Sequence, residues 1–200
     1  MIYQSCHQIM FVQYMPFLLM TFLGVDRYWE KGKPGLYTLG VFLMILTSFY
    51  FSIAGMAAIF LYGWYGYPKG IRKRKLFGFP VPMIVAVLSA GVLLVPTAYA
   101  ILQRSGSSQS QNLKELLMPN LQLDSSLYGT YSVGLTVILV AVLLGGIVCG
   151  SIRERVVSVV CVALLTVPVF AWGFNGMLYV RYKSLIPFLP FFCYLTAVFL

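Results

Sequence analysis

Charged residues are scarce in this chain. They make up 10% of its 200 residues, with five acids, fourteen bases and one histidine, whereas 60% of the residues are hydrophobic. A soluble globular domain has about 25% charged residues. The mean hydropathy of +0.87 means more apolar surface than one small core can enclose, so lipid is the implied solvent. The charged residues fall between long apolar stretches, where a bilayer tolerates them.

This scarcity also excludes several kinds of chemical site. No Ser-His-Asp set can be assembled around the single histidine, His7, and the chain has no phosphate-binding glycine loop. The cysteines have neither CxxC nor Cys/His metal-ligand spacing, and we interpret them as small buried hydrophobic residues. They are Cys6, Cys149, Cys161 and Cys193. We therefore predict no metal and no cofactor in this chain, and we assign no catalytic residue.

The net charge of +9 does not indicate nucleic acid. The bases cluster in short loops beside apolar runs and are not interleaved with aromatic residues on one soluble face. Such clusters are typical of segments that lie against anionic lipid headgroups. Membrane lipids are the predicted partner, and no nucleic acid is expected.

The apolar stretches predict a polytopic bundle of transmembrane helices, all-α and without a soluble domain. Crossing about 30 Å of hydrocarbon takes roughly 20 helical residues. The stretch 36–66 is too long for one upright helix and too short for two full ones. The predicted spans are 6–24, 36–47 with 53–66, 79–101, 128–150, 156–173 and 184–200, with a polar external loop at 103–127. Residues 1–200 thus form one transmembrane domain.

The positive-inside rule decides how 36–66 crosses the membrane. The loop 67–75 is strongly basic and belongs in the cytoplasm. If 36–66 crosses once, seven Lys and Arg residues lie on each side; if it is a hairpin, Arg27, Lys31 and Lys33 move inside and the count becomes ten against four. The bias favours a short helical hairpin.

The tip of this hairpin is a candidate cavity wall. Two legs of about 14 residues reach only about 21 Å, so the tip around Ser48 and Tyr50 stops short of the far interface. Non-helical backbone at that depth persists only where it is buried in protein or lines a water-filled cavity. The alternative is a long, tilted single helix whose serines bond back to their own i−4 carbonyl groups.

A second candidate site lies at Asn175, Arg181 and Lys183. The predicted topology places the two bases on the outer face, where the positive-inside rule gives them no advantage. Arginine offers a planar fork and lysine a point charge to a phosphate group at the membrane surface. The alternative is that both are flanking charges that extend to the interface.

Small residues on the predicted span 128–150 indicate close helix packing. Gly146 and Gly150 form a GxxxG pair, extended backwards by Ala141 and Gly145. Small residues let helix backbones approach closely. Packing inside the chain's own bundle and dimerisation are both compatible with this pattern.

Four segments together give the chain a resemblance to a known family. They are Gln8 to Leu18, Gly24 to Lys33, Thr47 to Ser52, and Asn175 to Tyr179 with Lys183 to Pro190. In this order they resemble the YfhO-like bacterial membrane proteins. Each motif is mostly apolar and weakly specific alone; the order is moderately specific, and the similarity covers the whole chain.

The resemblance implies a fold and a function. The family is similar to the GT-C glycosyltransferases, which transfer a sugar from a polyprenyl-phosphate carrier on the outer face of the membrane, and its members are linked to teichoic-acid glycosylation. It implies a GT-C-like bundle in the bacterial cytoplasmic membrane and a short hairpin at 36–66. It also implies a polyprenyl-phosphate sugar as partner, with Ser48, Tyr50, Asn175, Arg181 and Lys183 near the carrier pocket.

One departure leaves the enzyme assignment open. In such enzymes the acidic catalytic motif lies in the first external loop, and this chain begins downstream of it. The first residues lack the basic region of a signal peptide, and the last ten, Phe191 to Leu200, are apolar. We therefore expect an internal fragment, inactive by itself. The alternatives are a transporter or flippase-like scaffold and a non-enzymatic membrane subunit.

Overall fold

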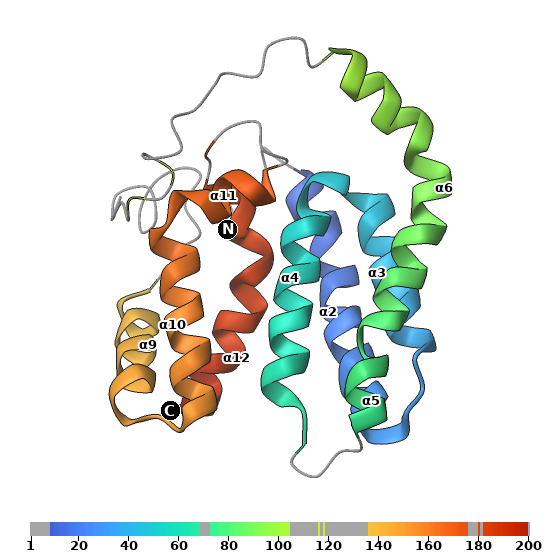
Figure 1. Ribbon diagram of the computed structural model, residues 1–200. Coiled ribbons are helices and arrows are strands. Elements are labelled where there is room, and N and C mark those ends of the chain that lie inside the picture. Colours follow the sequence, from blue (N-terminus) through green and yellow to red (C-terminus); the bar gives the residue numbers. More distant parts are fainter. Residues whose placement is uncertain are drawn as a thin grey trace. The chain divides into compact units, whose positions relative to one another are not determined.

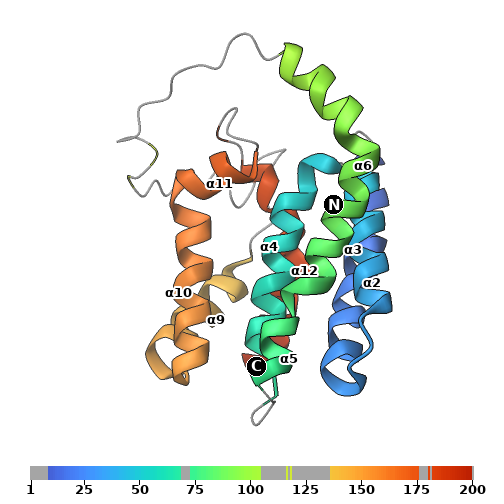
Figure 2. The same cartoon turned by 45° about the vertical axis from the view of Figure 1, so that its right-hand side comes forward.

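The computed structural model describes residues 9–68, 73–104, 116, 118, 136–175, 180 and 182–199. Every regular element in these ranges is a helix (Figures 1 and 2), which confirms the predicted all-α class. Three stretches in these ranges are long and apolar enough to cross a membrane: Phe49–Gly66, Lys75–Pro96 and Tyr182–Phe199. A bent pair, Ile152–Thr166 with Pro168–Phe174, makes a fourth if it counts as one span.

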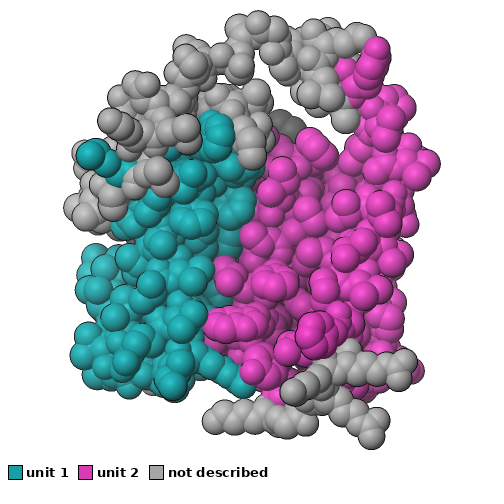
Figure 3. Space-filling model, in the orientation of Figure 1, with its two compact units in different colours: residues 1–7, 109–200 teal, residues 8–108 magenta. Residues whose placement is uncertain are grey.

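The chain divides into two compact units. Unit 1 comprises residues 1–7 and 109–200, and unit 2 comprises residues 8–108 (Figure 3). Each is described by itself. His7, Cys6 and most of the predicted external loop 103–127 lie outside the described residues.

The described part of unit 2 consists of five helices that follow one another along the chain. They are α2 (Ile9–Lys31), α3 (Gly35–Thr47), α4 (Phe49–Gly66), α5 (Lys73–Gly78) and α6 (Pro80–Arg104). Helix α2 ends at Gly32, which has a φ of +70° and donates its N–H to the carbonyl of Tyr28 at 3.0 Å. Only glycine adopts this left-handed conformation without strain, so it ends the helix efficiently.

Helices α3 and α4 form the predicted hairpin. Ser48 alone separates them, with φ −151° and ψ 97°, and the chain reverses there (Figure 1). The sequence placed the two legs at 36–47 and 53–66, whereas the helices have 13 and 18 residues and α4 begins directly after Ser48. The second leg is therefore the longer one, and it is among the helices long enough to span a membrane.

Glycines bring α2 and α3 into backbone contact. A β-carbon at Gly24 of α2 would lie 2.6 Å from the backbone nitrogen of Tyr37 in α3. Gly40 of α3 faces Thr21 of α2 just as closely, so a β-carbon there would lie 3.0 Å from the Thr21 Cα. Small residues at such crossings allow the close backbone approach that holds helices together in lipid.

An aromatic cluster fills one end of unit 2, and Phe79 lies at its centre. The Phe79 ring stacks on Trp29 with a centroid distance of 5.0 Å and on Tyr37 at 5.4 Å. Tyr28 and Phe60 approach it at 6.1 Å. Phe79 is 3% exposed and packs against Gly63 of α4, where a β-carbon would collide with the ring. One side chain between α5 and α6 thus joins these helices to α2, α3 and α4.

The end of α2 and helix α5, which carry Lys31 and Lys75, lie at this same end. The Tyr28 hydroxyl of α2 donates to the carbonyl of Lys75 in α5 at 3.0 Å. A β-carbon at Gly32 would lie 3.8 Å from the Lys75 Nζ. The hairpin α3–α4 therefore returns the chain to the end of unit 2 at which α2 ends, as the count of Lys and Arg residues on each side of the membrane predicts.

This arrangement predicts that Lys33 and Phe77 face the same side of the membrane. Single cysteines at these two exposed positions, in a chain whose native cysteines are replaced, should react with a membrane-impermeant maleimide from the same side. A cysteine at Ser108, in the predicted external loop, serves as the reporter of the other side. Labelling of positions 33 and 77 from opposite sides would contradict the hairpin topology.

Unit 1 contains the remaining described helices. They are α9 (Val137–Cys149), α10 (Ile152–Thr166), α11 (Pro168–Phe174), the 3₁₀ helix η1 (Tyr182–Phe188) and α12 (Leu189–Phe199). Helices α9 and α10 pack at Gly146, which lies against the Ser158 side chain, whereas a β-carbon at Gly145 would meet no atom within 4 Å. The GxxxG glycine Gly146 therefore packs inside the chain's own bundle.

Candidate functional site

A sharp bend at one end of unit 1 creates the candidate site. Helix α10 ends at Thr166 and α11 begins at Pro168, at an angle of 79°. Val167 still donates its N–H to the carbonyl of Ala163 at 2.9 Å, and Pro168 starts a new helix because its ring suits the first helical position. Figure 1 shows α11 crossing the end of α10.

The 3₁₀ helix η1 is held against α11 by buried contacts. The Ser184 hydroxyl donates to the carbonyl of Ala171 at 3.2 Å, and both residues are fully buried. The rings of Phe174 and Phe188 lie 5.6 Å apart. We call α11 with Asn175, together with η1, the α11–η1 segment.

Two of the predicted site residues belong to the α11–η1 segment. Asn175 follows α11 directly, is 1% exposed, and donates its backbone N–H to the carbonyl of Trp172 at 3.1 Å. Lys183 lies in η1 and is partly exposed, whereas the other six residues of η1 are all buried. Lys183 is therefore the residue of η1 that reaches the surface. Arg181 lies outside the described residues.

The other two predicted residues lie at the hairpin tip in unit 2. Ser48 caps α4, because its Oγ accepts the backbone N–H of Phe51 at 3.4 Å. The Ser52 hydroxyl donates back to the carbonyls of Ser48 and Met44. The rings of Tyr50 and Phe51 form an edge-to-face pair, with the centroids 4.9 Å apart. These hydrogen bonds give both serines a structural role at the turn.

The structure thus brings Asn175 and Lys183 into one segment, and Ser48 and Tyr50 into one turn. The two pairs belong to different units. Among the described residues, no group of three or more His, Cys, Asp or Glu side chains is arranged to hold a metal ion. Lys183 is the charged residue of the α11–η1 segment, and a lysine ammonium is a point charge of the kind that can bind a phosphate.

Sequence reasoning missed two hydrogen bonds that join α2 to α4. The Tyr14 hydroxyl of α2 donates to the carbonyl of Phe51 at 3.1 Å and so fixes the hairpin tip. The Tyr62 hydroxyl of α4 donates to Asp26 Oδ1 at 2.8 Å. These partners are more than 30 positions apart, so no spacing rule within one helix could have paired them.

The comparisons with known proteins bear on the identity of this bundle. The family described as "Bacterial membrane protein YfhO" matches residues 1–179. The chain belongs to this family. The match confirms the resemblance drawn from the sequence motifs, and both the α11 bend and the hairpin lie within it. Neither the curated proteins nor the solved structures give a match.

Proposed function

We propose that this YfhO-family chain is the transmembrane portion of a glycosyltransferase that takes its sugar from a polyprenyl-phosphate carrier, for glycosylation of a teichoic-acid-type cell-surface polymer. The α11–η1 segment would hold the carrier phosphate through Lys183 and Arg181, with Asn175 beside them. Ser48 and Tyr50 would shape the cavity wall at the hairpin tip.

The observation that carries this proposal is the exposure pattern of η1. A 3₁₀ helix that follows a broken span is irregular backbone of the kind that membrane proteins keep where it lines a cavity or is buried in protein. Here every η1 side chain is buried except Lys183. A cation at the surface of a buried turn suits the phosphate of a lipid whose prenyl chain remains in the membrane.

Removing the charge of Lys183 in the full-length protein should weaken both carrier binding and sugar transfer. Lys183→Gln should lower photo-crosslinking to a photoactivatable polyprenyl phosphate about tenfold, as expected when one charge-assisted hydrogen bond is lost. Transfer of lipid-linked sugar to cell-wall polymer should fall in parallel. Arg181→Gln should act in the same direction.

Two variants make this experiment specific. Lys183→Arg keeps the positive charge and should retain most of the crosslinking. Arg155→Gln removes an exposed base at the other end of α10 and should change nothing. Undiminished transfer in Lys183→Gln would remove this residue from the site.

The broken span also favours a second candidate function. Discontinuous helices in membrane transporters surround substrate sites near the middle of the bilayer, and the 79° bend between α10 and α11 is such a break. A flippase-like protein would move lipid-linked sugar across proteoliposome membranes without transferring it to an acceptor. Movement without transfer would replace the glycosyltransferase by this alternative.

A further inference from the structure

The strongest unassigned feature lies in unit 2, where a basic surface meets an apolar groove. The segments 26–33 and 69–75 together carry eight bases and two acids, a net charge of +6. One of these acids, Asp26, accepts a hydrogen bond of 2.8 Å from the Tyr62 hydroxyl. The other, Glu30, is exposed. Among the described side chains of these segments, the four bases Arg27, Lys31, Lys33 and Lys75 therefore outnumber the two carboxylates.

Folding brings the end of α2 close to α5. Lys31 is the last residue of α2, Lys33 lies two positions beyond it, and Lys75 belongs to α5. The hydrogen bond between Tyr28 Oη and the Lys75 carbonyl, 3.0 Å long, holds α5 against α2. All three lysine side chains are exposed, and in the part of the chain that the structure describes none of them pairs with an acid. They are available to a negatively charged ligand.

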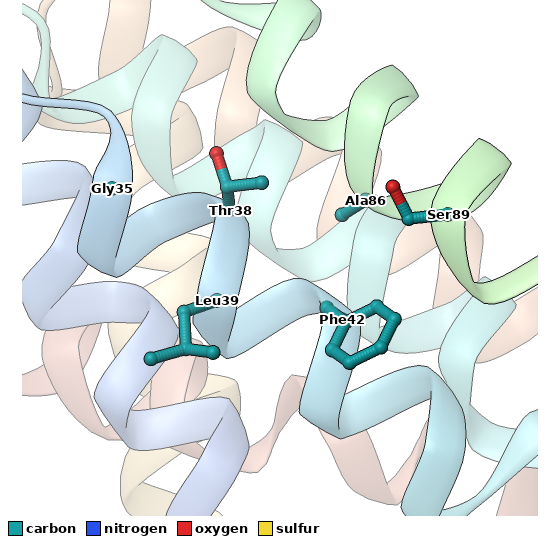
Figure 4. A pocket seen from close by; sticks show the side chains of 6 residues that line it. All are labelled: Gly35, Thr38, Leu39, Phe42, Ala86 and Ser89. Atoms are coloured by element: carbon teal, nitrogen blue, oxygen red, sulfur yellow. The ribbon is translucent and has the colours of Figure 1, made fainter.

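A groove between α3 and α6 begins close to Lys33 in the sequence. Its cavity volume is about 470 Å³, and it is lined by Gly35, Thr38, Leu39, Phe42, Ala86 and Ser89. Figure 4 shows Thr38 and Phe42 of α3 opposite Ala86 and Ser89 of α6. Gly35, at one end of the groove, is only two residues from Lys33.

The groove is apolar even though two hydroxyl groups line it. Thr38 Oγ1 donates to the Pro34 carbonyl at 3.1 Å, and Ser89 Oγ donates to the Val85 carbonyl at 2.8 Å. Both hydroxyls are satisfied within their own helix turns, which removes the cost of placing hydrocarbon against them. The remaining lining is aliphatic or aromatic, as an acyl chain requires.

We propose that this groove and the neighbouring lysines form one binding site for an anionic phospholipid. The headgroup phosphate lies at Lys31, Lys33 and Lys75, and an acyl chain lies along Gly35, Phe42 and Ala86 in the groove. Positive charge selects the headgroup, and the groove fixes the position of the chain. The site does not depend on the proposed glycosyltransferase function, because it uses none of the residues assigned to the sugar carrier.

Native mass spectrometry of the purified protein tests this site. The probe is an equimolar mixture of dioleoyl phosphatidylglycerol and dioleoyl phosphatidylcholine in mild detergent, so that only the headgroup charge differs. The wild-type protein should retain phosphatidylglycerol preferentially. Lys33→Gln and Lys75→Gln should each lower its retention about fivefold, the effect of one base near an anionic lipid surface.

A second pair of variants tests the groove separately from the charge. Ser89→Phe fills the groove and should lower phosphatidylglycerol retention without removing any base. Val92→Phe places the same ring on the same helix at a position that is 75% exposed and outside the groove, and it should retain the lipid as the wild type does.

The outcomes separate a built site from general attraction. Arg155→Gln removes an exposed base from unit 1. If it lowers retention as much as Lys33→Gln, only net charge matters and the site is overturned. Equal effects of Ser89→Phe and Val92→Phe would overturn the role of the groove. Thermal unfolding of each variant identifies a loss of folding. If Ser89→Phe does not fold, Lys33→Gln still tests the headgroup part of the site, because Lys33 is exposed.

Discussion

Replacing Phe79 with alanine should lower the free energy of unfolding by about 3–5 kcal/mol, the usual cost of truncating a fully packed phenylalanine. Phe79 is 3% exposed and stacks between Trp29 and Tyr37. The truncation leaves a cavity that Gly63 cannot fill, because glycine has no side chain. Denaturation by sodium dodecyl sulfate of the protein in neutral detergent micelles, followed by tryptophan fluorescence, measures the loss.

Phe77 provides a matched control for this prediction. It lies two residues earlier, has the same side chain and is 79% exposed. Phe77→Ala should change the free energy of unfolding by no more than about 0.5 kcal/mol. The Phe79→Ala variant should also shift the Trp29 emission to longer wavelength, because water reaches the indole. Equal losses from the two variants would place Phe79 outside the packed cluster.

The contrast between these two phenylalanines shows a limit of sequence reasoning. Residues 76–82 read Leu-Phe-Gly-Phe-Pro-Val-Pro, and no periodicity distinguishes Phe77 from Phe79. Burial of Phe79 depends on Gly63, sixteen positions earlier, which leaves the space that the ring occupies. Such a complementary pair becomes visible only when the helices are placed side by side.

The hairpin, in contrast, could be predicted because two independent constraints agreed on it. The length of 36–66 fitted neither one nor two full spans, and the count of Lys and Arg favoured an even number of crossings. Neither constraint needs tertiary contacts. The hydrogen bond between Tyr28 and Lys75, which holds α5 beside the end of α2, is the structural counterpart of that count.

The bend that forms the α11–η1 segment was not predicted, because proline has no single meaning within an apolar run. Pro168 begins α11 after a sharp bend, whereas Pro16 and Pro96 lie inside the continuous helices α2 and α6. The same residue type therefore marks a break in one helix and none in two others. Packing of Ser184 against Ala171 stabilises the bent arrangement, and the apolar pattern of 156–173 carries no sign of it.

Replacing Gly24 with alanine should destabilise unit 2 by about 2–3 kcal/mol, the upper part of the range for overpacking a core. The added methyl group would lie 2.6 Å from the Tyr37 nitrogen, 2.7 Å from the Tyr37 Cα and 2.9 Å from the Leu36 carbonyl carbon. These are backbone atoms, so no rotamer change relieves the collision, and α2 and α3 must move apart. Thermal unfolding in detergent micelles should show the loss directly.

Gly91→Ala is the matched control, since it adds the same methyl group inside α6, where a β-carbon would meet no atom within 4 Å. It should cause no loss, because alanine favours a helix more than glycine does. The difference between the two variants isolates the helix crossing from helix propensity. In a membrane, exchanging a helix–lipid contact for a helix–helix contact changes the free energy of apolar surface little, so helices associate mainly through close packing. If the substitution at Gly24 moves α2 and α3 apart, the hydrophobic effect does not drive them back together. Equal thermal stability of the two variants would show that α2 and α3 do not contact each other at Gly24.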